Sequence, residues 1–294
     1  MKKQNYMKGE KRLDTVIRGT DLHLIVEPHE LDIAATLDCG QCFRFRTEED
    51  GTITGVAFDQ PLHLMQTEHE VVFYNTSQDE YETIWRGFFA LDEDYDSIKR
   101  FLSADSVLKK AITFSPGIRV LRQDRFEALI SFIISQNNNI PRIKGCIERL
   151  CRRFGTRRGD AYSFPDATTL ANSHIEDYRE LGLGYRDVYI HECAHMVANG
   201  EIDLAAISHM ELADAREALL RIKGVGIKVA ECALLFGFHQ LGAFPVDTWI
   251  KKALSGFYPK GFPEKFRPVA GIAQQYLFHY IRTAPDVEER LRLA

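Results

Sequence analysis

The chain has 294 residues, of which 45% are apolar and 27% charged, and its formal net charge is −5. This length allows two domains, or one domain with an appended layer, and the charge excludes a protein that is basic throughout, although a local phosphate-binding patch is still compatible with it. No apolar run reaches the roughly 20 residues of a membrane helix, and the segment before Leu13 is polar and lysine-rich, so we expect no signal peptide, no membrane partner and a cytoplasmic location.

The first part of the chain has the pattern of an antiparallel sheet. Apolar and polar residues alternate in short runs such as residues 22–26 and 71–74, with a turn signal at residues 49–51. From Glu80 onward the apolar spacing is helical. The sequence therefore predicts an α+β fold, with a β-rich N-terminal domain over residues 1–115 and a two-part helical body over residues 116–294.

A helix with one apolar stripe is expected after Asp124, which is placed as its N-cap with Glu127 as the reciprocal partner. The stripe consists of Phe126, Leu129, Ile130, Ile133 and Ile134.

The cysteine pattern favours free thiols in a reducing compartment. The six cysteines are Cys39, Cys42, Cys146, Cys151, Cys193 and Cys232. Only Cys39 and Cys42 form a CxxC pair, and no second pair completes a structural zinc site, so we interpret these two as small, partly buried side chains.

The segment from His191 to His195 matches the HExxH pattern of zinc peptidases, in which two histidines one helical turn apart bind the metal. The pattern has only three fixed positions and needs a third ligand, for which Glu211 or Glu217 could serve. A helix with a polar face explains the same spacing, and we expect no metal.

A helix-hairpin-helix unit is predicted over residues 212–236. The helical pattern breaks at residues 223–226 and restarts at Ile227. Gly224 and Gly226 allow a sharp turn and a close approach to a phosphate, and the next helix offers its positive N-terminus to the same anion. Such a hairpin holds a DNA backbone without reading its sequence.

Basic residues cluster between Arg221 and Lys260, where only two carboxylates occur. If the chain has a nucleic-acid face, this stretch is where we expect it.

Lys228 and Asp247 are the candidate catalytic residues. A lysine amine attacks only in its neutral form, which partial burial and a helix N-terminus both favour, although a surface phosphate contact would explain Lys228 equally well. Asp247 follows Pro245-Val246 and has the position of an N-cap, but a fixed carboxylate there can also stabilise positive charge on a sugar whose glycosidic bond is breaking.

The glycine hairpin, the lysine and the Pro-Val-Asp string together resemble the helix-hairpin-helix (HhH-GPD) DNA glycosylases, and the chain is most similar to the 8-oxoguanine DNA glycosylase/AP lyase family, from about Asp21 to Ala284. The further matching strings are Gly40–Arg44, Leu121–Asp124, Asn137–Ile140 with Arg142, Leu181–Arg186, and Gln274 with Phe278.

The resemblance implies a bifunctional enzyme of base excision repair that acts on duplex DNA containing oxidised guanine, as a monomer and without a cofactor. In this family the lysine, here Lys228, attacks C1′ of the flipped nucleotide, expels the base and forms a Schiff base that undergoes β-elimination. Asp247 would support this step.

The resemblance also assigns the residues around the lesion. The Gly40 carbonyl would accept the N7 hydrogen that 8-oxoguanine has and guanine lacks, Gln274 would bind the base edge, and Phe278 and Cys232 would enclose the ring. The alternative for Gln274 and Phe278 is a helix that lines the core.

The opposite cytosine would contact Asn137, Arg142 and Arg186, while Tyr185 enters the base stack, so lesions opposite cytosine are the expected substrates. Other interpretations are open: three consecutive asparagines can end one helix and cap the next, Tyr185 can be a packed loop residue, and Arg186 can pair with a carboxylate.

One position departs from the family pattern, because Trp249 stands where relatives often have a histidine, which puts a local phosphate contact in doubt. The endonuclease III-like branch is excluded since no cysteine follows Cys232 to build its iron-sulfur cluster. The remaining alternatives are a monofunctional alkylbase glycosylase, against which Lys228 argues, and a non-catalytic DNA-binding module.

Overall fold

The computed structural model describes residues 13–284, which form two compact units. Unit 1 consists of the described parts of Met1–Cys39, Leu64–Arg122 and Val246–Ala294, and unit 2 consists of Gly40–His63 and Gln123–Pro245. Each unit is thus assembled from separate stretches of the chain. The contiguous division at residue 115 stays a prediction, and the polar segment before Leu13 lies outside the described residues.

The strands follow the order β1-β2-β6-β5-β4-β3, and β5 passes from unit 2 into unit 1. Their bounds are β1 Thr15–Arg18, β2 Asp21–Ile25, β3 Phe45–Thr47, β4 Ile53–Ala57, β5 Gln60–Gln66 and β6 Glu70–Phe73, with a separate hairpin of β7 Arg157–Arg158 and β8 Ala161–Tyr162.

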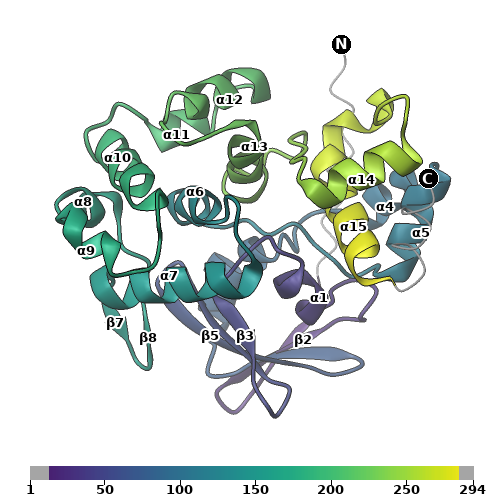
Figure 1. The fold of residues 1–294 in the computed structure, drawn as a ribbon. Helices are drawn as coiled ribbons and strands as arrows, with labels where there is room; N and C mark the ends of the chain where they lie inside the picture. The colour runs from purple at the N-terminus through teal and green to yellow at the C-terminus, as the bar shows by residue number, and fades with distance from the viewer. Residues whose placement is uncertain (1–12, 285–294) are drawn as a thin grey trace. The chain divides into compact units, whose positions relative to one another are not determined.

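The remaining elements are helical (Figure 1). In unit 1 they are α1 Ile33–Asp38, α2 Gln78–Glu80, the π-helix η1 Tyr81–Trp85, α3 Arg86–Phe88, α4 Tyr95–Leu102, α5 Ser106–Phe114, α14 Thr248–Phe257, the 3₁₀ helix η2 Glu264–Val269 and α15 Ala270–Thr283. In unit 2 they are α6 Arg125–Ile134, α7 Ile140–Phe154, α8 Ala167–Ala171, α9 Ile175–Arg179, α10 Arg186–Ala198, α11 Leu204–Ile207, α12 Leu212–Leu220 and α13 Ile227–Phe236.

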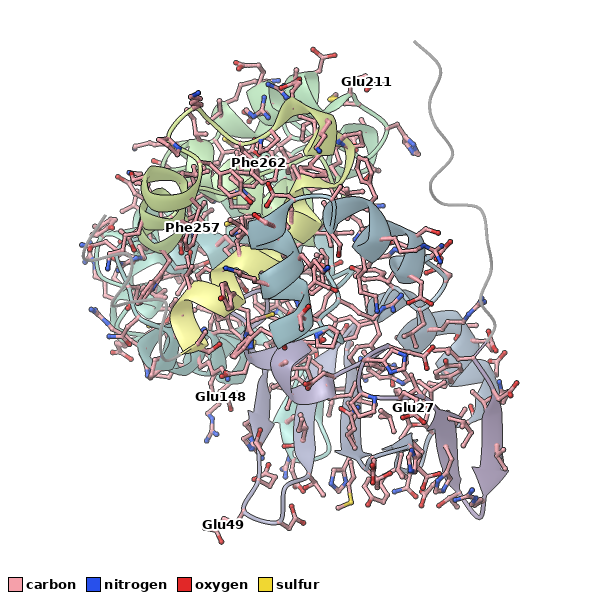
Figure 2. All side chains as sticks on the ribbon, turned by 90° about the vertical axis from the view of Figure 1, so that its right-hand side faces the viewer. Glu27, Glu49, Glu148, Glu211, Phe257 and Phe262 are labelled. Atoms are coloured by element: carbon pink, nitrogen blue, oxygen red, sulfur yellow. The ribbon has the colours of Figure 1, made fainter. Side chains whose placement is uncertain are left out.

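The predicted antiparallel strands are confirmed, and so is the α+β class. Leu22 lies opposite Phe73 and Leu24 opposite Val71, and all four side chains are buried, as the alternating pattern requires. The expected turn between β3 and β4 is also present, with Glu49 at its tip (Figure 2). No helix of the described residues is long and apolar enough to span a membrane.

Two elements were not expected from the pattern. The short helix α1 lies inside the stretch that we interpreted as sheet, and it is capped by the Asp32 side chain, which accepts from the Ala35 amide at 2.9 Å. The hairpin of β7 and β8 interrupts the helical body. Both elements are too short to produce a readable periodicity.

Helix α6 is the central helix of unit 2, where it packs against α7, α10 and α13 (Figure 1). The predicted stripe is buried, but so are Ala128, Ser131 and Phe132, so the helix is covered on nearly all sides. Asp124 is its N-cap, as expected, and accepts from the amides of Phe126 and Glu127 at 3.0 and 2.9 Å.

Glu127 does not act as the reciprocal partner of that cap. Its carboxylate faces the Arg44 guanidinium instead, with 3.7 Å between Oε2 and Nη1, and both residues are partly buried. Arg44 precedes β3 and is distant from Glu127 in the chain, so their pairing depends on tertiary packing. A local capping pattern cannot indicate it.

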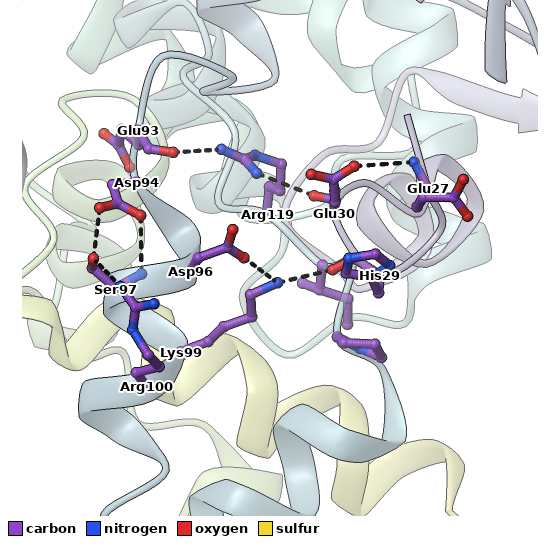
Figure 3. A network of polar contacts seen from close by, with 12 residues as sticks. Glu27, His29, Glu30, Glu93, Asp94, Asp96, Ser97, Lys99, Arg100 and Arg119 are labelled. Carbon is purple, nitrogen blue, oxygen red and sulfur yellow. Dashed lines mark hydrogen bonds and ion pairs between the residues drawn. The ribbon is translucent and has the colours of Figure 1, made fainter. Parts of the chain in front are cut away.

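Unit 1 is built around aromatic side chains and a buried arginine. Phe73, Tyr81 and Phe89 meet edge to face, with ring centroids 5.5 and 6.1 Å from the Phe73 ring. The guanidinium of Arg119 donates to the carbonyl oxygens of Phe89 and Ala90. It also donates to those of Glu93 and Glu30 (Figure 3). Because these carbonyls come from separate loops, Arg119 fixes the loops to one another.

Candidate active site and DNA-binding hairpin

The helix-hairpin-helix unit predicted from the sequence is confirmed. Helices α12 and α13 pack against each other and are joined by residues 221–226. Gly224 has a φ of +84°, and a Cβ at this position would lie 2.3 Å from the Tyr189 ring of α10. The turn therefore requires glycine for its backbone conformation and for its close contact with Tyr189.

Gly226 has a different environment. A Cβ there would meet nothing within 4 Å, and the residue is the N-cap of α13, with no side-chain hydrogen bond closing that helix end. The next residue, Ile227, is 67% exposed. An open helix N-terminus of this kind is suited to bind an anion.

Lys228 lies in the first turn of α13 and is half-buried. Its Nζ donates to the Ser135 hydroxyl at 3.2 Å and lies 5.2 Å from the centroid of the Phe132 ring. Ser135 and Phe132 are three residues apart on α6 and its C-cap, so both face α13. The amine is thus held against α6 in unit 2, whereas the amine of a lysine on an open surface would lack such contacts.

The cations near the hairpin are not all available to a phosphate. Lys223 donates to the Glu192 carboxylate at 2.8 Å, and this ion pair raises the pKa of Lys223. The basic stretch from Arg221 to Lys260 is moreover divided between the two units at residue 245. That these basic residues form one nucleic-acid face stays a prediction.

The HExxH segment lies on α10 and its residues have separate partners. His191 Nε2 lies 3.1 Å from the Ser173 carbonyl oxygen, Glu192 pairs with Lys223, and the His191 and His195 rings meet edge to face at 4.5 Å. Among residues 13–284, no cluster of three or more His, Cys, Asp or Glu side chains could hold a metal. All six cysteines are buried free thiols.

Asp247, in unit 1, is the N-cap of α14 and accepts from the Ile250 amide at 2.8 Å. One of its carboxylate oxygens is therefore fixed by the backbone. Two residues later, the ring of Trp249 lies under the Lys252 ammonium, with 4.7 Å from Nζ to the centroid. Trp249, which makes this cation–π contact, is the residue at which the sequence departs from the family pattern.

Gln274 and Phe278 lie one turn apart on α15. Gln274 is only 4% exposed, and no protein group of the described residues bonds its Oε1 atom. Burying an oxygen that no protein group bonds raises the free energy of the folded state, and such an atom is typical of a ligand-binding site. Phe278 is partly exposed and lies 5.8 Å from the Arg282 guanidinium.

Two further predicted contacts to the base lie in unit 2. Gly40 has a φ of +76°, a conformation that favours glycine. Cys232 is 3% exposed and lies one turn after Lys228 on α13.

The three asparagines before α7 have distinct environments. Asn138 donates to the Ile134 carbonyl at 3.1 Å and Asn139 caps α7 by accepting from the Arg142 amide at 3.0 Å. Asn137 is exposed and has a φ of +46°, which is unusual for a residue with a side chain. The structural interpretation of the run thus holds for Asn138 and Asn139 and does not account for Asn137.

Arg186 is 3% exposed, and it pairs with no carboxylate among residues 13–284. It donates to the carbonyl oxygens of Gln136, Leu183 and Asn137. Its guanidinium also lies 4.5 Å from the centroid of the Tyr185 ring. Arg186 therefore fixes the loop that carries Asn137, and a direct base contact of Arg186 stays a prediction.

Tyr185 and Arg142 are the exposed members of this group. Tyr185 is 52% exposed, although its ring meets the Tyr189 ring edge to face at 5.8 Å. Arg142 is exposed, and its Nη2 lies 3.5 Å from the Gly182 carbonyl oxygen.

Sequence reasoning missed Ser135, Phe132 and Tyr189. The first two belong to a helix whose apolar stripe was recognised, but nothing in the sequence placed that helix beside Lys228. Tyr189 lies 35 residues before Gly224, and no local pattern indicates their contact.

The chain matches two family models. Residues 23–129 match the 8-oxoguanine DNA glycosylase N-terminal domain, and residues 130–262 match the HhH-GPD superfamily of base excision DNA repair proteins. A probable N-glycosylase/DNA lyase of Methanothermobacter thermautotrophicus is 34% identical over 238 residues, which is 69% of this chain and 75% of that protein.

Solved structures agree with these matches. MBOgg1, determined in complex with a low-affinity DNA ligand, superposes with a TM-score of 0.87 at 38% identity and covers 92% of this chain and 98% of that one. The 8-oxoguanine glycosylase/lyase of Clostridium acetobutylicum, in complex with duplex DNA that contains cytosine opposite the lesion, gives a TM-score of 0.85 at 36% identity and covers 93% and 98%. The hairpin, the lysine that follows it and these full-length similarities together show that the chain belongs to the 8-oxoguanine DNA glycosylase/lyase family of the HhH-GPD superfamily.

Proposed function

We propose that this protein binds duplex DNA, flips 8-oxoguanine out of the helix, cleaves its glycosidic bond with Lys228 and then nicks the strand. Membership of the family carries the enzyme class, a DNA glycosylase with AP lyase activity. The observation in this chain that carries the role of Lys228 is its placement: the amine lies directly after the glycine hairpin and is held by Ser135 and Phe132.

The chemistry follows from a neutral lysine amine. Its lone pair forms a bond to C1′ while the C1′–N9 bond breaks, and the bonding pair leaves with the base, which takes up a proton. The amine nitrogen gives up one proton, and the C1′–O4′ bond then breaks as O4′ takes up a proton, which leaves a protonated Schiff base between Nζ and C1′. Loss of a C2′ proton forms the C2′–C3′ double bond, breaks the C3′–O3′ bond, expels the 3′ phosphate and nicks the strand.

Asp247 supports this step electrostatically. The Ile250 amide fixes one carboxylate oxygen, so the negative charge has a constant position without rearrangement during the reaction. Positive charge that develops on the sugar is stabilised by such a fixed carboxylate.

Recognition of the damaged base is assigned to Gly40, Gln274, Phe278 and Cys232. The Gly40 carbonyl accepts the N7 hydrogen of 8-oxoguanine, and Phe278 and Cys232 enclose the ring. The unpartnered Oε1 of Gln274 is an acceptor ready for the edge of the base. The N7 contact contributes roughly ten- to hundredfold selectivity, because an unsatisfied buried group costs about 1–3 kcal/mol.

The opposite cytosine is assigned to Asn137 and Arg142, with Arg186 as a third contact. Tyr185, exposed at the start of α10, fills the gap that the flipped base leaves. Gly224 and Gly226 hold the DNA backbone at the hairpin. A preference for lesions opposite cytosine follows, and equal excision opposite all four bases would contradict it.

Borohydride trapping on a labelled duplex with 8-oxoguanine opposite cytosine tests this function. The wild-type protein should give a reduced, covalent crosslink, and Lys228→Gln should lower its yield at least about a thousandfold. Lys223→Gln is the matched control, because Lys223 is a cation five residues earlier whose amine is already paired with Glu192. Lys223→Gln should retain the crosslink.

Other outcomes identify the alternatives. Release of the base without a crosslink would indicate a monofunctional glycosylase that uses Asp247 and water. Binding without release or crosslink would indicate a DNA-binding module. Action as a monomer and a cytoplasmic location stay predictions from the sequence.

A further inference from the structure

Two groups hold the Lys228 amine, and both present negative partial charge to it. They are the hydroxyl of Ser135, 3.2 Å from Nζ, and the face of the Phe132 ring, 5.2 Å from Nζ to its centroid. Both belong to α6 and its C-cap, which packs against α13 inside unit 2. Their arrangement determines which way the amine can point.

The Ser135 hydroxyl can only accept from Lys228. A hydroxyl has one hydrogen, and that of Ser135 is donated to the Phe132 carbonyl oxygen at 2.8 Å. Only the lone pairs of the Ser135 oxygen are therefore available to the Nζ atom of Lys228. Because Ser135 closes the end of α6, this donation also fixes the hydroxyl in one rotamer.

The Phe132 ring, like the Ser135 oxygen, attracts the hydrogens of the amine and repels its lone pair. The face of an aromatic ring carries negative partial charge, so it attracts an N–H group and repels a nitrogen lone pair. The ring is 2% exposed, stacks on Phe236 at 5.3 Å and 22°, and meets the Phe43 ring edge to face at 5.7 Å. These contacts hold the ring in a fixed position.

We propose that Ser135 and Phe132 are positioning residues that direct the lone pair of the neutral Lys228 amine toward C1′: the Ser135 hydroxyl accepts one hydrogen of the amine, and the face of the Phe132 ring repels the lone pair on the same side. A neutral amine has two hydrogens and one lone pair. With its hydrogens turned toward α6, the lone pair points away from α6. In the protonated amine the third hydrogen occupies that direction, so the proton that must leave before attack is the one that faces the substrate.

This proposal rests on the proposed function, and it adds an orientation requirement to it. Fixed orientation of a nucleophile increases the rate of the step that forms the bond without changing the affinity for DNA. A purely structural role of Ser135 would change stability, or both rate and affinity, instead.

The experiment compares Ser135→Thr with Ser135→Val on a duplex that contains an abasic site, which reports amine attack independently of base recognition. Threonine and valine have nearly the same shape, but only threonine retains the hydroxyl, so effects on folding cancel between the two variants. Single-turnover formation of the borohydride-reducible complex is measured, together with the Kd for a duplex with a tetrahydrofuran abasic analogue and the midpoint of thermal unfolding.

Ser135→Val should form the complex about tenfold more slowly than Ser135→Thr, and Ser135→Thr should stay within about threefold of wild type. The Kd should differ by less than about twofold between the variants. Equal rates of Ser135→Thr and Ser135→Val would overturn the orientation role while leaving the function of Lys228 intact. No complex with the wild-type protein would overturn both the proposed function and this inference.

Discussion

Asn137 and Asn139 are separated by one residue, yet only the side chain of Asn139 caps helix α7. Asn139 satisfies a backbone amide at the start of α7. Asn137 is exposed and adopts a φ of +46°, a conformation that asparagine tolerates better than most residues and that has a free-energy cost of its own. Backbone strain at an exposed polar residue is typical of a binding position.

The two residues therefore form a matched pair for mutation. Asn139→Ala should lower the free energy of unfolding by about 1 kcal/mol, because the helix loses its cap. Asn137→Gly should leave that free energy nearly unchanged, since glycine adopts a positive φ readily, but it should weaken the preference for lesions opposite cytosine. Urea unfolding and excision rates opposite each of the four bases measure the two effects. A large loss of stability in Asn137→Gly would contradict this division.

The hairpin between α12 and α13 is the element that we propose to bind the DNA backbone, and its two glycines have different surroundings. Gly224 makes the turn possible, because its backbone has a positive φ and the Tyr189 ring leaves no room for a Cβ. Gly226 has open space around it and stands at the uncapped N-terminus of α13. We therefore expect folding to depend on the first glycine and the approach of a phosphate to depend on the second.

Alanine at each glycine separates folding from binding. Gly224→Ala should lower the free energy of unfolding by about 1–3 kcal/mol, through strain at positive φ and overlap with Tyr189. Gly226→Ala should change stability by less than about 0.5 kcal/mol but should raise the Kd for undamaged duplex DNA severalfold, because its methyl group stands between backbone and phosphate. Thermal unfolding and fluorescence anisotropy at fixed salt are the measurements. If Gly226→Ala bound DNA like the wild type, the hairpin would not contact the backbone there.

The pH dependence of stability is a property of the whole molecule to which one buried group contributes in an identifiable way. Burial raises the pKa of Glu127 to about 7, although the Arg44 guanidinium opposes the shift and the carboxylates of Asp124 and Asp59 add to it. In the unfolded chain a glutamate has a pKa of about 4.3. The folded protein therefore binds this proton more tightly, so the contribution of Glu127 to stability is complete below about pH 4.3 and is lost as the pH rises through about 7.

Glu127→Gln removes this titration and preserves the side-chain volume. The difference in free energy of unfolding between wild type and Glu127→Gln should shift by up to about 3 kcal/mol in favour of the variant as the pH increases from 4.5 to 7.5. Urea unfolding of both proteins at several pH values in this range tests it. Parallel stability curves would show that Glu127 does not change its protonation between the folded and unfolded states.

The elements that can be predicted from the sequence are those with a local physical signature. The alternation in residues 22–26 and 71–74 gives β2 and β6, because one face of each strand is buried. Asp124 and Asp247 cap the helices that they precede, and the glycines of the hairpin mark its turn. Lys228 is the predicted nucleophile because of its place after that hairpin and because of the family resemblance, and this role stays a prediction.

The rest was decided by contacts between segments that are distant in the chain. Glu127 has the spacing of a cap partner, but packing places it beside Arg44. The segment from His191 to His195 has the spacing of a zinc site, but His191 lies against the Ser173 carbonyl and Glu192 pairs with Lys223. Ser135 and Phe132 reach the amine of Lys228 only because α6 and α13 pack together. The sequence by itself determined the local elements and the hairpin, since propensity, capping and periodicity act over a few residues. Only the tertiary structure decided what surrounds Lys228, because burial and hydrogen-bond partners depend on the packing of whole helices.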